Sequence, residues 1–209
     1  MRAASDGRLD IVLPMVADVA DVRRAQEIIA AERIKLEGEG QKLGPVRIGA
    51  MIEVPSAVMT AAKIARLVDF FELGTNDLVQ YVLAVDRSND KVADWFRSLH
   101  PAVLESISQT LRAAHDVGIP AIICGEMAST PAYAVVLLGL GARDLSMTPA
   151  AIPRVSRVLS GVDSRDAVAI ALECLECQTA DEVEELVHQR FLSRWPQLFS
   201  AENLPALKA

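Results

Sequence analysis

Short apolar runs alternate along the chain with longer segments in which apolar residues recur every three or four positions. Five runs have the length and composition of buried parallel strands, at 11–16, 47–53, 68–74, 121–126 and 144–147. The segments between them carry apolar residues at helical spacing, with charged residues on the other positions. Because strands that alternate with helices form a parallel sheet covered by helices, the pattern predicts an α/β fold.

Local signals indicate where several helices begin and end. Pro55 suits the first turn of a helix, because that position needs no backbone N–H donor. Gly118 follows a segment of helical period and suits a helix C-cap. Thr179 and Glu182 have the spacing of a capping box at the start of the last helix. We therefore expect one domain over residues 1–195 and a C-terminal tail over 196–209.

Two architectures agree with this order of elements: a doubly wound sheet and part of a (β/α)₈ barrel. The chain has 209 residues and five predicted strands. A complete barrel has eight strands and about 250 residues, so a barrel here would be a partial one. The pattern of hydrophobic residues alone leaves both architectures open.

Charge and cysteine content exclude several functional classes. The 21 Lys and Arg residues face 28 Asp and Glu residues, for a net charge of −7, so we expect no nucleic-acid partner. No stretch has the roughly 20 uninterrupted apolar residues of a membrane span, and the N-terminus lacks a signal-peptide pattern. The three cysteines Cys124, Cys174 and Cys177 suggest no disulfide framework and favour a reducing, cytoplasmic location. Zinc is not expected at Cys174 and Cys177, because no second cysteine pair exists.

Polar residues stand where the predicted strands end, which is where both architectures form their active sites. Glu53 closes the second run, Asp77 follows the third and Cys124 lies in the fourth. Glu53 and Asp77 could supply hard oxygen ligands to Mg²⁺. Otherwise Glu53 could only favour the dipole of the following helix, and Asp77 could only cap the helix after the third strand. Cys124 could be a reactive thiol that exchanges a proton, or an ordinary core cysteine.

Two further residues of the same stretch could bind an anion. Asn76 could donate from its amide, or it could simply hold the turn after the third strand. Arg87 could neutralise a phosphate or carboxylate through a forked contact. The alternative for Arg87 is a surface ion pair with Asp86 or Asp90.

Five motifs in this order resemble one known family. The motifs "IEVPSA", "FFELGTNDLVQYVLAVDRSND", "LHPAV", "CGEMAS" and "LLGLGARDLSM" are similar to enzyme I of the bacterial phosphoenolpyruvate-dependent sugar phosphotransferase system. Pyruvate phosphate dikinase and phosphoenolpyruvate synthase are more distant relatives. The resemblance runs from about residue 2 to about residue 190. It implies a phosphoenolpyruvate-binding (β/α)₈ TIM-type barrel in which the five runs are strands four to eight. The first three strands and an N-terminal phosphohistidine domain would lie outside this chain.

The resemblance also implies roles for the five candidate residues. Glu53 and Asp77 would bind Mg²⁺. The substrate site would consist of Asn76, Asp77 and Arg87. Cys124 would protonate the methylene carbon as pyruvate forms. The implied activity is phosphoryl transfer from phosphoenolpyruvate to a histidine of the N-terminal domain, which passes it to a histidine phosphocarrier protein. The family further implies a homodimer. The alternative is a truncated, non-catalytic barrel that serves dimerisation or regulation.

The chain departs from the family pattern at two places. The usual CGEMAGDP has Ser129 and Thr130 in place of its Gly-Asp pair, which changes the loop after Cys124. The usual TQYTLAVDR has Val79 and Val82 in place of its threonines, which we interpret as changes in packing.

Overall fold

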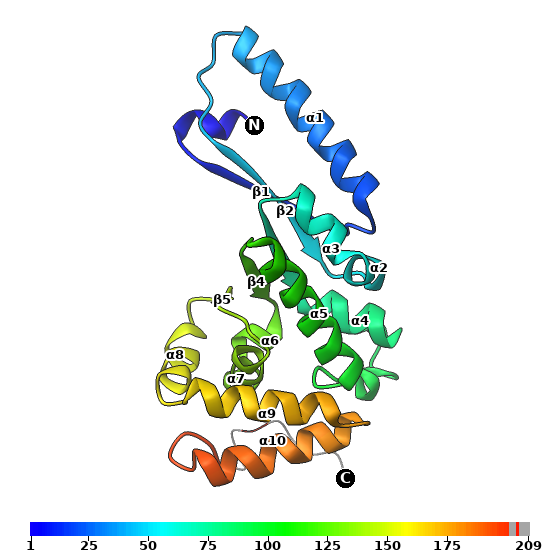
Figure 1. Ribbon diagram of the computed structural model, residues 1–209, viewed down its shortest axis with the longest axis vertical. Helices are drawn as coiled ribbons and strands as arrows, with labels where there is room; N and C mark the ends of the chain where they lie inside the picture. The colour runs from blue at the N-terminus through cyan, green and yellow to red at the C-terminus, as the bar shows by residue number, and fades with distance from the viewer. Residues whose placement is uncertain (201–203, 205–209) are drawn as a thin grey trace.

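The computed structural model describes residues 1–200 and 204, and in this part of the chain it forms one parallel sheet of five strands (Figure 1). The strands are β1 (Leu9–Leu13), β2 (Val46–Ile52), β3 (Phe70–Gly74), β4 (Ala121–Cys124) and β5 (Asp144–Leu145). Each predicted strand region overlaps one of them, so the α/β prediction is confirmed. The first strand ends earlier than predicted, at Leu13, because Pro14 has no N–H to continue the ladder.

The order of the strands distinguishes the two architectures. Neighbours in the sheet follow the chain, β1-β2-β3-β4-β5, and every pair is parallel. A doubly wound sheet would reverse its order at a switch point, whereas consecutive staves of a (β/α)₈ barrel do not. The fold is therefore a partial barrel of this type, and within the described residues β1 and β5 each pair on one side only.

Ten α-helices connect or follow these strands in the described residues. They are α1 (Val19–Gly38), α2 (Pro55–Met59), α3 (Ala61–Ile64), α4 (Thr75–Leu83), α5 (Pro101–Val117), α6 (Glu126–Ser129), α7 (Pro131–Gly139), α8 (Ile152–Ser160), α9 (Ser164–Glu176) and α10 (Ala180–Arg194). Gly118 ends α5 with a φ of 78°, and Thr179 and Glu182 form the predicted capping box of α10. The helical segment predicted from Pro55 is broken at Thr60, whose hydroxyl donates back to the carbonyl of Ser56.

The two faces of the sheet differ in polarity. In the register of the strands, one face carries fully buried side chains that pack against the helices: Ala50, Ile52, Phe71, Leu73 and Ile123. The other face carries the polar Arg47, Glu72 and Cys124 beside the apolar Met51, Phe70 and Ile122. The hydrophobic core therefore lies between the sheet and its helices, and the polar side chains project into what would be the inside of a barrel.

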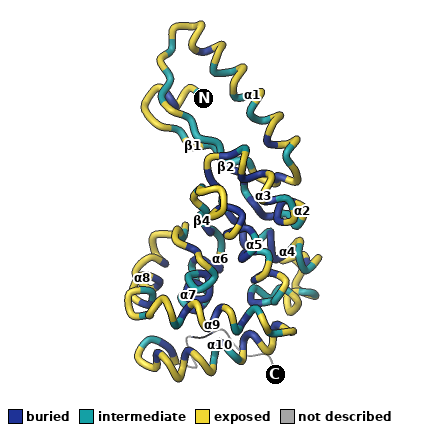
Figure 2. Tube along the Cα trace, in the orientation of Figure 1, coloured by how far each residue is buried: buried dark blue, intermediate teal, exposed yellow. Residues whose placement is uncertain are grey.

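The molecule is elongated, with β1 and α1 at one end and α9 and α10 at the other (Figure 1). Helix α1 is exposed along most of its length (Figure 2). It buries only Val22 and Leu36 and leaves Ile34 71% exposed. In the predicted tail, Phe199 and Leu204 are buried, and the ring of Phe199 lies 4.8 Å from that of Phe191. Positions 201–203 and 205–209 of that tail lie outside the described residues.

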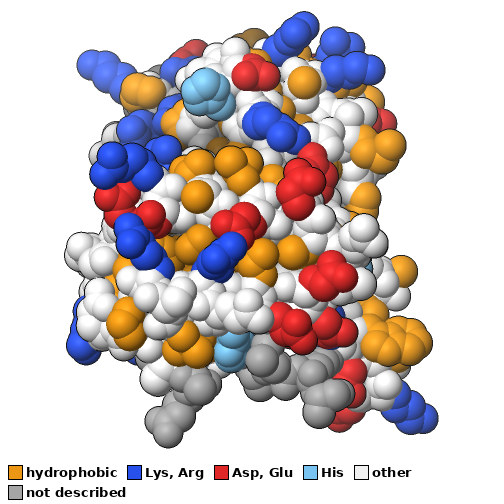
Figure 3. Space-filling model, turned by 60° about the horizontal axis from the view of Figure 1, so that its bottom comes forward, with side chains coloured by type: hydrophobic (Ala, Val, Ile, Leu, Met, Phe, Trp, Pro, Cys, Tyr) orange, Lys and Arg blue, Asp and Glu red, His pale blue; other side chains and the backbone are white. Residues whose placement is uncertain are grey.

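The surface view that brings the α9–α10 end forward shows acidic and basic side chains interspersed (Figure 3). No broad basic field covers this face, in keeping with the negative net charge. Among the described helices, none combines the length and the apolar character that crossing a bilayer would require.

Candidate active site

The carboxyl ends of β2, β3 and β4 bring the predicted positions Glu53 and Cys124 to one edge of the sheet. Ile52 pairs with Leu73, and Gly74 pairs with Cys124, so Glu53 follows β2 next to the end of β3. A Cβ atom on Gly74 would overlap Oε2 of Glu53. The Glu53 carboxylate therefore lies directly over Gly74, and the absent side chain of the glycine makes room for it.

Glu53 is held in place and partly desolvated. Glu53 is only 3% exposed, and its Oε1 accepts a hydrogen bond of 2.8 Å from the backbone N–H of Met15. Met15 adopts the left-handed backbone region at φ 52° in the loop after β1, which turns its N–H toward the carboxylate. Burial raises the pKa of Glu53, the Met15 N–H opposes that shift, and the negative Asp77 adds to it. A cation bound here would relieve both unfavourable effects.

Asp77 stands in the first turn of α4 rather than at its N-cap, which is Gly74, so the capping alternative for Asp77 is wrong. Its Oδ1 lies 3.5 Å from the guanidinium of Arg87. The backbone N–H of Arg87 donates to Gln80 Oε1 at 3.1 Å, which fixes the start of the loop after α4. The loop after α4 thus brings Arg87 back to the first turn of α4, where its guanidinium neutralises Asp77.

The alternative ion pairs of Arg87 are not formed in the structure. Asp86 accepts hydrogen bonds from the backbone N–H and the hydroxyl of Ser88, at 2.8 and 2.6 Å. These bonds lower the pKa of Asp86 and direct its carboxylate into its own turn. The guanidinium of Arg87 is therefore positioned by Asp77 and not by its sequence neighbours.

One hydrogen bond fixes the orientation of the Asn76 side-chain amide. Its Oδ1 accepts from the backbone N–H of Glu126 at 3.0 Å, so its NH₂ group remains to donate elsewhere. Asn76 and Arg87 both line a cavity of about 200 Å³, together with Ala93, Phe96 and Glu126. An amide donor and a guanidinium on one small cavity are suited to bind an anion.

Cys124 is a protonated thiol in the resting structure. Its S–H donates to the carbonyl of Leu73 at 3.2 Å. Burial raises its pKa to about 11, with the charges of Glu72 and Glu53 contributing. At neutral pH the group is an acid that still carries its proton. Because that proton now points at a backbone carbonyl, the S–H group must turn about the Cβ–Sγ bond before it can protonate a substrate.

Two residues that support Cys124 were not among the predicted site residues. The hydroxyl of Thr75, which is fully buried, donates to the carbonyl of Cys124 at 2.7 Å and links the start of α4 to the end of β4. Glu72 shares a sheet face with Cys124, and burial raises its pKa. The sequence did hold a signal for Glu72, because it is a charged residue inside the apolar run predicted as a strand at 68–74. Gly125 has a φ of 96°, and a Cβ there would overlap the Thr75 hydroxyl oxygen.

The carboxylates of the site suit a metal ion that takes few protein ligands. No group of three or more His, Cys, Asp or Glu side chains is arranged around a common point among the described residues. Glu53 and Asp77 are close enough for the charge of one to raise the pKa of the other. Two carboxylates fit Mg²⁺, which usually completes its octahedron with waters and substrate oxygens.

Comparison with known proteins confirms the resemblance found in the motifs. The sequence pattern of the family described as "PEP-utilising enzyme, PEP-binding domain" matches residues 1–164. A phosphoenolpyruvate-protein phosphotransferase of Haemophilus influenzae is 35% identical over 193 residues, which cover 92% of this chain and 34% of that protein. A protein of Escherichia coli named phosphoenolpyruvate-dependent phosphotransferase system is 43% identical over 187 residues, which cover 88% and 25%. The chain thus spans a quarter to a third of these relatives.

Solved structures support the fold. A citrate lyase from Burkholderia xenovorans matches with a TM-score of 0.53 at 18% identity, over 88% of this chain and 63% of that one. RipC from Yersinia pestis matches with a TM-score of 0.50 at 14% identity, over 75% and 66%. At these identities the likeness concerns the arrangement of strands and helices alone.

Proposed function

Because the chain belongs to the family of PEP-utilising enzymes, whose PEP-binding domain covers most of it, we propose that the carboxyl ends of β2, β3 and β4 bind phosphoenolpyruvate with Mg²⁺. Glu53 and Asp77 would hold the metal ion, and Asn76 and Arg87 would contact the phosphate. The observation that carries the proposal is the cavity that Asn76 and Arg87 share, next to the two carboxylates.

Binding would exchange one ion pair for stronger contacts. The Asp77–Arg87 pair is long, at 3.5 Å, and both side chains are at least one-third exposed. Such a pair stabilises the resting state by about 0–1 kcal/mol, so opening it costs little. Asp77 would then face the metal, while Arg87 would turn its forked N–H groups to the phosphate beside the NH₂ of Asn76.

The proposed reaction removes the phosphoryl group from phosphoenolpyruvate and leaves an enolate. The P–O bond to the enol oxygen breaks, and a new P–N bond forms to a histidine of another part of the complete enzyme. Bound Mg²⁺ would supply positive charge beside the phosphate and enolate oxygens. Cys124 would rotate away from the Leu73 carbonyl and give its proton to the methylene carbon, so that pyruvate forms. The thiolate would regain a proton from water.

Other parts of the longer relatives would supply the remaining steps of this proposal. The acceptor histidine and the histidine phosphocarrier protein that takes the phosphoryl group next belong to that larger enzyme. In a non-catalytic barrel used only for dimerisation or regulation, nothing would require the Asn76 amide, the two carboxylates and the Cys124 thiol to meet at one edge of the sheet. We therefore favour the enzyme over that alternative.

The test is a calorimetric titration of phosphoenolpyruvate with Mg²⁺ and again in excess EDTA. We expect weak binding that depends on Mg²⁺, and about a tenfold loss of affinity for Arg87→Gln, because a charge-assisted contact is removed. Arg165→Gln is the matched control, since that arginine pairs with Asp163 on the surface of α9. Tight binding in EDTA would contradict the roles of Glu53 and Asp77.

A further inference from the structure

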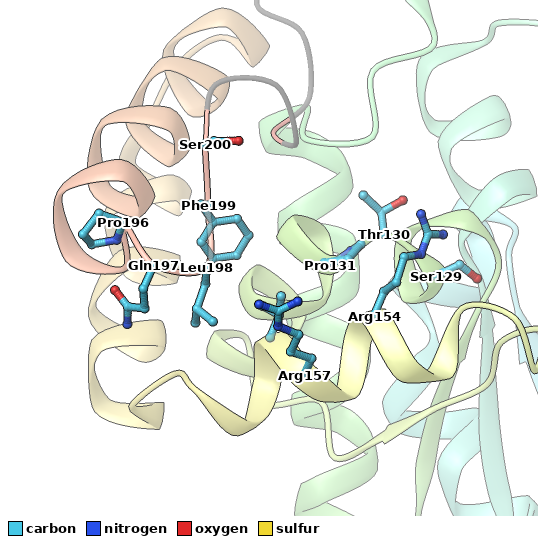
Figure 4. Close-up of a pocket in the computed structure, with 11 residues that line it drawn as sticks. Ser129, Thr130, Pro131, Arg154, Arg157, Pro196, Gln197, Leu198, Phe199 and Ser200 are labelled. Atoms are coloured by element: carbon cyan, nitrogen blue, oxygen red, sulfur yellow. The ribbon is translucent and has the colours of Figure 1, made fainter.

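A second and larger cavity, of about 660 Å³, lies between the start of α7, helix α8 and the segment after α10 (Figure 4). Arg154 and Arg157 border it from α8, and Thr130 borders it from the start of α7. Leu198 and Phe199 close the opposite wall with apolar side chains. The cavity is separate from the one that Asn76 and Arg87 line, and it shares no residue with it.

The two arginines of this cavity are the unusual feature. They stand three residues apart on one side of α8, and both rise toward the space between Thr130 and Leu198 (Figure 4). Neither forms an ion pair with any acid among the described residues, and within that part of the chain no Asp or Glu lines the cavity. Neighbouring arginines do pair: Arg165 with Asp163, Arg190 with Glu173 and Arg194 with Asp166.

The start of α7 adds to the positive potential. The helix begins at Pro131 with Thr130 as its N-cap, and no side chain caps the backbone N–H groups of its first turn. The Thr130 hydroxyl donates to the carbonyl of Glu126 at 3.0 Å, so its proton is already engaged. The two guanidinium groups therefore carry the charge recognition, and the dipole of α7 acts in the same direction.

We propose that this cavity binds a small phosphorylated metabolite with at least two negative charges. The forked N–H groups of Arg154 and Arg157 match phosphate oxygens, and the wall of Leu198 and Phe199 suits an apolar body attached to the phosphate. A volume of this size is typical of ligand sites. The family motif CGEMAGDP would place an aspartate at position 130, where it would compete for the arginines, and Thr130 leaves them available.

A short path connects this cavity to the proposed active site. Helix α6 is four residues long, and the carbonyl of Glu126 at its start accepts from Thr130 while the N–H of Glu126 donates to Asn76. Because the two sites share this helix and both favour phosphate, they must be assayed apart. An Arg87→Gln background without Mg²⁺ weakens the first site and leaves the second site unchanged.

The experiment is a calorimetric titration of pyrophosphate into Arg87→Gln protein at constant ionic strength. We expect one saturable site, and an affinity at least about tenfold lower when Arg154→Gln and Arg157→Gln are added. Thr130→Asp should lower the affinity similarly, because it places a carboxylate beside the arginines. Arg190→Gln is the matched control and should change the affinity less than twofold. Thermal melting of each variant verifies that it is folded.

Two outcomes would overturn the inference: no saturable binding at millimolar pyrophosphate, or equal binding to the Arg154→Gln/Arg157→Gln variant. Neither outcome bears on the proposed function, which is tested by phosphoenolpyruvate and Mg²⁺ with Arg87 intact. Conversely, pyrophosphate binding in the Arg87→Gln background supports the cavity of Arg154 and Arg157 even if phosphoenolpyruvate fails to bind at the proposed active site.

Discussion

Replacement of Gly74 by Ala tests the arrangement at the centre of the proposed active site. The new Cβ would overlap Oε2 of Glu53 and would lie 3.1 Å from Glu53 Cβ and 3.3 Å from Met51 Sδ. The carboxylate would have to retreat by about 1 Å to reach ordinary contact distance. We expect Gly74→Ala to destabilise the protein and to weaken its Mg²⁺-dependent binding of phosphoenolpyruvate.

The size of the effect follows from the hydrogen bond that holds Glu53. A shift of about 1 Å away from the Met15 N–H, now 2.8 Å from Oε1, exceeds the range of a hydrogen bond. A hydrogen bond to a charged group stabilises by about 1.5–3 kcal/mol, and at 3% exposure water cannot fully replace it. We therefore expect the free energy of unfolding to fall by about 1.5–3 kcal/mol.

Urea unfolding and calorimetry give the two readouts. Gly38→Ala is the matched control, because a Cβ at this last residue of α1 meets nothing within 4 Å, and it should stabilise by at most about 0.5–1 kcal/mol. In a Glu53→Ala background the overlapping atom is gone, so Gly74→Ala should cost measurably less than it does alone. Wild-type stability and wild-type Mg²⁺ dependence in Gly74→Ala would refute the placement of the Glu53 carboxylate over Gly74.

Three further predictions concern the thiol, a buried ion pair and assembly. In a Cys174→Ser/Cys177→Ser background, the rate of Cys124 alkylation by iodoacetamide should keep rising with pH toward about 11 instead of levelling off near 9.0, and adding Glu72→Gln should move the rise to lower pH. A plateau near 9.0 in the same background with Glu72 intact would contradict the raised pKa. Arg97 forms an ion pair of 2.7 Å with Glu184, which is 6% exposed, so Arg97→Met should lower the free energy of unfolding in urea by about 3 kcal/mol. Arg190→Met, at an exposed pair, should change it by no more than about 1 kcal/mol, and equal losses in the two variants would contradict the prediction. The edges of β1 and β5 should favour a homodimer in sedimentation equilibrium, and a monomer of 22.6 kDa across micromolar concentrations would count against it.

The positions of the strands could be predicted because each is a short apolar run bounded by polar residues. The same logic placed Glu53 and Cys124 at strand ends, and the parallel register brings those ends to one edge of the sheet. Capping at Thr179 and Gly118 was equally predictable, because those residue types satisfy helix ends by local chemistry. These features depend on neighbours in the sequence or on the period of the pattern.

The features that could not be predicted depend on contacts between distant segments. Nothing near Glu53 in the sequence announces that the N–H of Met15, 38 residues earlier, would hold its carboxylate. Arg87 has acids at positions 86 and 90 beside it, yet the return of the loop after α4 places it against Asp77. The break at Thr60 also needed the structure, because its hydroxyl competes for a helix carbonyl that the apolar period does not reveal.

The charges at the proposed active site imply an order of binding. The charges of Glu53, Glu72 and Asp77 all act on Cys124 at the end of β4, and within the described residues of this site only Arg87 pairs with one of these acids. Burial and mutual repulsion raise the pKa of Glu53, so the resting site already resists further negative charge. Phosphoenolpyruvate is itself an anion and would add to that repulsion. A divalent cation that entered first would reverse the local potential and free Arg87 from Asp77 for the phosphate. On this reasoning the affinity for phosphoenolpyruvate should rise with Mg²⁺ concentration until the cation site is full, which is why the comparison with EDTA is the decisive one.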